Sequence, residues 1–126
     1  MLLSVEDIDV RYGRNHAVKN VSLNIVDGEI VTVLGANGAG KSSLLKAIQG
    51  TLKLPNGSII FKGENINRWS APKRVQSGLV MVPEGRQIFI SMTVEENLLM
   101  GAYSRKNVDV TSEIKTIFER FPNLKE

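Results

Sequence analysis

The 126-residue sequence contains no cysteine, which excludes a disulfide framework and any metal site built from thiolates. It has one histidine, His16, next to a turn signal. We expect His16 to be a solvated turn residue, and we assign it no role in metal binding. No apolar run approaches the roughly 20 residues that a membrane-spanning helix needs. Acidic residues occupy the start of the chain, where a signal peptide has basic ones. We therefore expect no segment that crosses a membrane.

Charge is nearly balanced, with 16 basic and 13 acidic residues and a net charge of +3. The basic residues are spread along the chain, and no run is dense enough to indicate a nucleic-acid partner. Hydrophobic residues make up 42% of the sequence, which is enough for a core. The length fits one domain, so we treat residues 1–126 as belonging to a single domain.

Two kinds of strand pattern occur. Residues 7–12 and 21–25 alternate between apolar and polar side chains, which predicts strands that are buried on one face. Residues 30–34 and 79–82 are nearly continuous apolar runs, and such runs are typical of strands covered on both faces in a parallel sheet. Residues 58–61 predict a further short strand.

Helical patterns alternate with the later strands. Apolar residues recur at helical spacing over 44–52 and 114–121. Ser70 is placed as the N-cap of a short helix, and Thr93 forms a capping box with the glutamate three residues later. The order of elements predicts an α/β fold in which a small antiparallel β layer joins a parallel α/β core.

The most specific feature is the run from Gly35 to Ser42, which fits G-x-x-x-x-G-K-[ST]. Glycines allow successive main-chain N–H groups to point at a phosphate group, because no Cβ blocks the turn or the ligand. The helix that starts near Lys41 adds its positive end. Lys41 is expected to reach the β- and γ-phosphates, and the Ser42 hydroxyl to bind Mg²⁺. The sequence therefore predicts a site for a nucleoside triphosphate.

A phosphate-binding loop alone does not identify the function, because kinases, GTPases, helicases and transporters all use one. The Asn-Lys-x-Asp motif that guanine-specific GTPases use does not occur in this sequence. A P-loop kinase, an ATPase acting on nucleic acid or the ribosome, and a nucleotide-binding module without turnover remain open as alternatives.

The flanks of the loop narrow the choice. Residues 21–30, which lead into the loop, and residues 57–63 closely resemble the ATP-binding-cassette (ABC) transporter family. Residues 82–89 with 92–98 are similar to the ATP-binding subunit of a branched-chain amino acid importer. The resemblance implies the P-loop NTPase fold of an ABC ATPase, and it implies ATP hydrolysis coupled to transport across the cytoplasmic membrane.

The resemblance also implies roles for individual residues. Tyr12 occupies the position of an aromatic residue that stacks on adenine, and Val18 would pack beside the base. The phosphates and Mg²⁺ of ATP would be held by a contiguous set: Asn37, Gly38, Ala39, Gly40, Lys41, Ser42 and Ser43.

Glu84 departs from the family pattern, which usually has a glutamine here that contacts magnesium and the attacking water. A carboxylate can still bind a hard cation, so Glu84 is retained with Lys41 as a catalytic residue and with Ser42 as a metal ligand. Gln87 could take over part of this role. Arg86 is interpreted as a surface or partner-contact residue.

Three family features do not occur in this sequence: the second acidic strand with its catalytic glutamate, the Leu-Ser-Gly-Gly signature and the switch histidine. We interpret the chain as the N-terminal portion of an ABC domain, truncated before the signature, and expect no hydrolysis by this portion alone. The resemblance implies membrane-spanning permease subunits and a second ATP-binding subunit as partners. It also implies a peripheral position on the cytoplasmic face of the membrane and no nucleic-acid partner.

Overall fold

The computed structural model describes residues 1–36, 38–54, 56–105 and 108–125. The chain divides into two compact units, Met1–Met81 and Val82–Glu126. Each unit is described by itself.

The first unit contains an antiparallel sheet of four strands in the order β2-β1-β3-β4. Its strands are β1 (Leu3–Tyr12), β2 (Asn15–Ile25), β3 (Asn56–Phe61) and β4 (Glu64–Asn65). The central strand β1 pairs on one side with β2 and on the other with β3, so that Leu3 lies opposite both Ile25 and Phe61. The predicted antiparallel layer is therefore confirmed, and the alternating pattern assigned residues 7–12 and 21–25 correctly.

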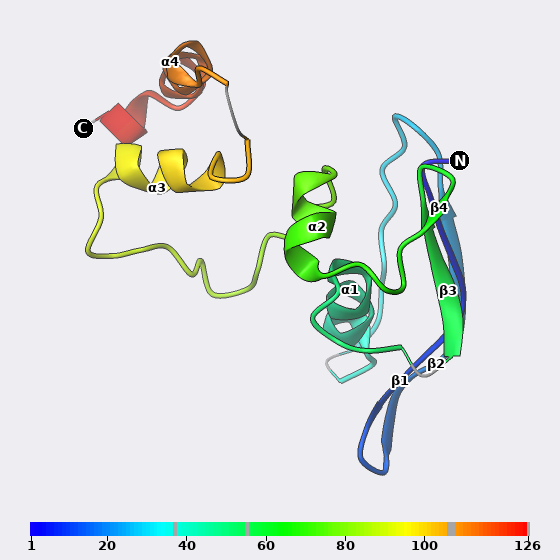
Figure 1. Cartoon of the computed structure of the whole chain (residues 1–126). Coiled ribbons are helices and arrows are strands. Elements are labelled where there is room, and N and C mark those ends of the chain that lie inside the picture. Colours follow the sequence, from blue (N-terminus) through cyan, green and yellow to red (C-terminus); the bar gives the residue numbers. More distant parts are fainter. Residues whose placement is uncertain (37, 55, 106–107, 126) are drawn as a thin grey trace. The chain divides into compact units, whose positions relative to one another are not determined.

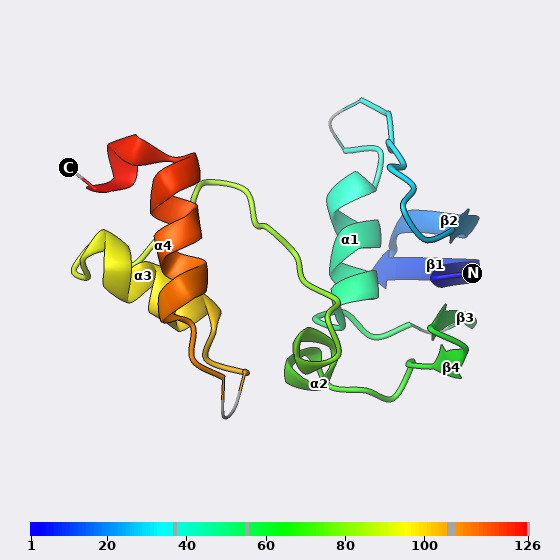
Figure 2. The same ribbon diagram turned by 90° about the horizontal axis from the view of Figure 1, so that it is seen from above.

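Two helices cover one face of this sheet, as Figures 1 and 2 show. They are α1 (Lys41–Gln49) and α2 (Ala71–Gln76). The predicted N-cap Ser70 accepts a hydrogen bond from the main-chain N–H of Lys73 at 3.3 Å. The helix predicted over 44–52 ends at Gln49, because Gly50 adopts a left-handed conformation that closes it.

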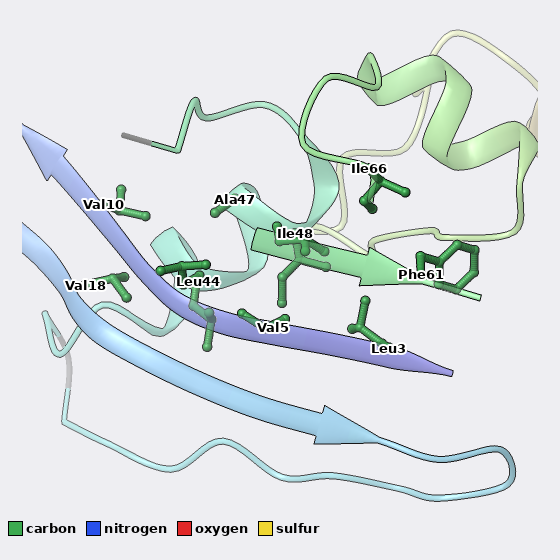
Figure 3. Close-up of a cluster of buried hydrophobic side chains, with 11 residues drawn as sticks. Leu3, Val5, Val10, Val18, Leu44, Ala47, Ile48, Phe61 and Ile66 are labelled. Atoms are coloured by element: carbon green, nitrogen blue, oxygen red, sulfur yellow. The ribbon is translucent and has the colours of Figure 1, made fainter. Parts of the chain in front are cut away.

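The core of the first unit lies between the sheet and α1 (Figure 3). α1 buries Leu44, Ala47 and Ile48, which lie on one side of the helix and face the sheet. The buried apolar side chains of this core are Leu3, Val5, Ile8, Val10, Val18, Leu44, Ala47, Ile48, Ile59, Phe61 and Ile66. The core fixes α1, and therefore the loop before it, against β1 and β2.

The second unit contains α3 (Val94–Gly101), α4 (Thr111–Arg120) and the 3₁₀ helix η1 (Pro122–Lys125). The predicted capping box is confirmed: the Glu96 N–H donates to the Thr93 hydroxyl at 3.1 Å, and the Thr93 N–H donates to the Glu96 carboxylate at 2.8 Å. The Asn97 side chain accepts from the Phe89 N–H at 2.9 Å and donates to the Phe89 carbonyl at 3.1 Å. These contacts hold the segment before α3 against the helix.

The two strands predicted over residues 30–34 and 79–82 are not formed, and this prediction was wrong for the described residues. Ile30, Leu34 and Val82 are 94%, 87% and 93% exposed. A strand needs a neighbouring strand to receive its main-chain hydrogen bonds, and no described segment pairs with either run. Both runs therefore remain extended without a sheet, and the parallel part of the predicted core is not built.

Candidate functional site

The loop that ends at Gly40 leads directly into α1. Gly38 and Gly40 have φ angles of 84° and 96°, a conformation that favours glycine. A Cβ on Gly40 would lie 2.2 Å from the main-chain oxygen of Ala17, so only glycine lets the loop approach β2 this closely. The sequence analysis explained these glycines by their role in phosphate binding. The structure adds a second reason, because Gly40 also brings the loop against the sheet.

The beginning of α1 has the properties of an anion site. The N-cap residue, Gly40, has no side chain that could cap the helix, and the first turn of α1 contains no acidic residue. The main-chain N–H groups of a first helical turn lack partners within the helix, and the helix dipole places positive potential there. Together they favour a phosphate group at this position.

A pocket of about 470 Å³ adjoins this helix start. It lies among β2, the loop and α1, and two ammonium groups, Lys19 and Lys41, belong to its lining. The Lys41 ammonium donates a hydrogen bond to the Gly35 carbonyl and is therefore folded over its own loop. The lining residues are His16, Ala17, Val18, Lys19, Val21, Val33, Leu34, Gly38, Ala39, Gly40, Lys41 and Leu44.

The pocket brings together five of the residues predicted for the nucleotide site: Val18, Gly38, Ala39, Gly40 and Lys41. Val18 is buried, and its side chain is part of the core. Asn37 lies outside the described residues. Ser42 and Ser43 follow Lys41 in the first turn of α1.

Tyr12 lies at the end of β1 and is 45% exposed. Its hydroxyl oxygen accepts a hydrogen bond from the Ser43 hydroxyl at 3.3 Å. This contact links the predicted base-stacking residue with the first turn of α1, although Tyr12 and Ser43 are 31 residues apart in the sequence.

His16 has a different environment from the one expected. It is half-buried on β2, lines the pocket and lies 2.5 Å from the Asp9 carboxylate through its Nε2. The hydrogen bond from His16, joined by one from the Asn20 N–H at 3.2 Å, lowers the pKa of Asp9 below its ordinary value. The interpretation of His16 as a solvated turn residue was therefore wrong. The turn is only Gly13–Arg14, and His16 already pairs with Arg11 in the β1–β2 register.

Glu84 belongs to the second unit and lies in the turn with Gly85. Arg86 and Gln87, which follow it, have φ angles of 64° and 39°. Groups of three or more possible metal ligands among His, Cys, Asp and Glu do not occur in the described ranges. The metal roles predicted for Ser42, in the first unit, and for Glu84, in the second, stay predictions.

Comparison with known proteins identifies the family. A family model described as ABC transporter matches residues 18–125. The chain belongs to the ABC transporter family. The match spans the loop, α1 and residues 82–125 of the second unit, and it confirms the resemblance to this family. The roles assigned to individual site residues stay predictions.

Relatives within the family include importer subunits with different cargoes. The chain is 39% identical over 125 residues to the high-affinity branched-chain amino acid transport ATP-binding protein BraG of Pseudomonas aeruginosa, covering 99% of this chain and 54% of that protein. It is 36% identical over 102 residues to the hemin import ATP-binding protein HmuV of Shewanella denitrificans, covering 81% of this chain and 40% of that protein. The chain thus spans about half the length of BraG and two fifths of the length of HmuV.

A solved structure shows the same fold. It is an ATP-binding cassette of an ABC transporter in its ADP conformation, and it aligns with a TM-score of 0.69 and 29% identity over 90% of this chain and 45% of its own. The P-loop NTPase fold class predicted from the sequence is confirmed by this similarity. Among the residues described, no helix combines the length and apolar character needed to cross a membrane.

Proposed function

We propose that this chain is the nucleotide-binding portion of an importer's ATP-binding subunit, and that it holds the phosphates of Mg-ATP at the loop 35–43. The observation that carries the proposal is the start of α1, which follows the glycine N-cap Gly40, contains Lys41 as its first residue and lies at the edge of a pocket large enough for part of a nucleotide. Family membership and the similarity to an ATP-binding cassette solved in its ADP conformation support the same ligand.

The residues present fit Mg-ATP. Main-chain N–H groups and the Lys41 ammonium supply positive potential, while the Ser42 hydroxyl is an oxygen ligand of the kind that Mg²⁺ prefers. The role of Glu84 as a second ligand is proposed from its position in the sequence alone. The bound nucleotide supplies the phosphoanhydride bond whose hydrolysis drives transport. In our proposal Lys41 binds the β- and γ-phosphates and counters the charge that develops on them. Tyr12 and Val18 orient the base.

For the cargo we propose a branched-chain amino acid. The similarity to BraG extends over nearly the whole chain. Residues 82–89 and 92–98 resemble the sequence of that subfamily, which supports the same cargo. HmuV, at 36% identity, is named for hemin import, so a different cargo is the second candidate. Membrane-spanning permease subunits and a second ATP-binding subunit are the proposed partners, with the protein peripheral to the cytoplasmic face of the membrane. A module that binds nucleotide without turnover is the alternative for this portion by itself.

A competition titration tests the proposed ligand. The full chain is saturated with a fluorescent ATP analogue in the presence of magnesium. The analogue is then displaced with unlabelled ATP, ADP or AMP. We expect the affinity to fall in that order, because each phosphate removed takes away contacts with the loop. Failure of the chain to bind the analogue, or equal displacement by AMP and ATP, would overturn the proposal.

A further inference from the structure

Arg74, on α2, is a buried cation outside the nucleotide pocket. Arg74 is only 3% exposed. The hydrogen bonds that the structure describes for its guanidinium all go to main-chain carbonyls, and no ion pair with a carboxylate is found for it within the described residues. Burial lowers the pKa of Arg74, yet an arginine remains protonated at neutral pH. The unit therefore contains a full positive charge that is satisfied by dipoles rather than by an anion.

Two of these carbonyls belong to the last turn of α1. The guanidinium donates from one nitrogen to the oxygens of Ala47 at 3.0 Å and Ile48 at 2.7 Å. It also donates to the Ile66 oxygen at 2.9 Å, which ties the end of α1 to the segment after β4. A Cβ on Gly50 would lie 2.8 Å from the Arg74 Nε, so glycine at the end of α1 leaves the space that the guanidinium fills.

The opposite end of α1 is the phosphate site. A helix carries positive potential at its first turn and negative potential at its last, and Arg74 lies against the negative end. α1 has 9 residues, so the two ends are about 13 Å apart at a rise of ~1.5 Å per residue. A charge buried in protein is screened much less by salt than an exposed one. Its attraction for a polyphosphate therefore extends along the helix.

We infer that Arg74 is a positioning residue of the phosphate site. It fixes the far end of α1 through the Ala47 and Ile48 carbonyls, and it places behind the helix a positive charge that strengthens anion binding at the start of α1. The inference rests on the proposed function, because it concerns the same site. It assigns part of the affinity for phosphate to a residue outside the glycine-rich loop and the pocket.

The test compares three variants of the full chain. Arg74→Gln removes the charge and keeps a polar side chain, and Arg74→Lys keeps the charge with fewer donors. Arg68→Gln removes the same charge from an exposed position six residues away and is the matched control. Affinities for ATP, ADP and AMP are measured with magnesium at low and at moderate ionic strength.

Coulomb attraction over this distance predicts that Arg74→Gln weakens ATP binding by about three- to tenfold. The loss is smaller for ADP and smallest for AMP, because it scales with ligand charge. Arg74→Lys stays close to wild type, and Arg68→Gln changes little. A merely structural role would weaken all three nucleotides equally and would not be rescued by lysine. That result, or equal ATP affinity of Arg74→Gln and Arg68→Gln, overturns the inference.

If Arg74→Gln does not fold, the pH dependence of nucleotide binding by Arg74→Lys tests the inference. A buried ammonium loses its proton far more readily than a guanidinium. The ratio of ATP to ADP affinity should then fall with rising pH in Arg74→Lys relative to wild type. The other cations of the two helices, Lys41, Lys46 and Lys73, are present in both proteins and cancel in this comparison. An unchanged ratio overturns the inference. Failure of wild type to bind ATP would instead overturn the proposed function.

Discussion

Tyr12 illustrates how a single residue joins two parts of the site. Its phenol oxygen accepts a hydrogen bond from Ser43 in the first turn of α1, and its ring remains partly exposed at the end of β1. An exposed aromatic ring offers a flat apolar face to a base. The position in the sequence suggested stacking, whereas the link to Ser43 could not be predicted, because it depends on how α1 packs on the sheet.

Tyr12→Ala should weaken ATP binding by about fivefold, since an aromatic stacking contact contributes roughly 1 kcal/mol. Binding of inorganic triphosphate should hardly change, because the proposed phosphate-binding loop remains. Both ligands are measured by competition against the fluorescent ATP analogue. An equal loss for triphosphate would show that Tyr12 supports the fold of the loop instead of contacting the base.

Asp9 makes the stability of the folded state depend on pH in the acidic range. Its pKa is lowered in the folded state, chiefly by the hydrogen bond from His16. Its contribution to stability is therefore complete above the ordinary value of 3.8 and is lost as the pH falls through the lower folded value. Thermal unfolding of wild type and Asp9→Asn should differ at about pH 7 and converge toward about pH 2. Asp27→Asn, in an exposed turn, is the control. A difference between wild type and Asp9→Asn that persists unchanged at low pH would contradict this account.

At the scale of elements, local signals predicted local structure well. The capping box at Thr93 and the N-cap at Ser70 were both assigned from the sequence and are both formed. These signals work because the side chain and the main-chain N–H groups that it satisfies are three residues apart. The alternating strands were also predictable, since alternation reports one buried face directly.

The apolar runs over 30–34 and 79–82 led to a wrong prediction, because strand formation there depends on segments far away in the sequence. A strand covered on both faces depends on neighbouring segments that supply its hydrogen bonds, and a pattern within the run cannot show whether they are present. The burial of Arg74 was not predicted for a similar reason. Its carbonyl partners come from α1 and from the segment after β4, so nothing near it in the sequence indicated a buried cation.

Thr93→Ala should lower the stability of α3 by about 1 kcal/mol, because the N–H of Glu96 loses its acceptor. The expected result is faster hydrogen exchange of the amides in the first turn of α3. Ser91→Ala, two residues earlier and exposed, is the matched control and should leave this exchange unchanged. Equal effects of the two substitutions would mean that the capping box does not stabilise the helix.

At the scale of the whole molecule, exposed apolar residues lead us to expect that the chain associates in solution. Ile30, Leu34, Val82 and Ile90 are each more than four-fifths exposed. Extended apolar segments without sheet partners recruit other chains. We expect the 126-residue chain to bind a hydrophobic dye and to associate in size-exclusion chromatography. Ile30→Thr with Val82→Thr should reduce both effects. A monodisperse monomer with a sharp thermal transition would contradict this prediction.

The central claim is that the loop 35–43 and the start of α1 hold the phosphates of ATP. The most direct test is titration of the full chain and its Lys41→Ala variant with a fluorescent ATP analogue in magnesium. Lys46→Ala, which removes the same charge from the exposed last turn of the same helix, is the control. We predict that Lys41→Ala lowers the affinity roughly tenfold to a hundredfold, because a charged hydrogen bond contributes about 1.5–3 kcal/mol, and that Lys46→Ala binds like wild type. Equal binding by wild type and Lys41→Ala would contradict the account.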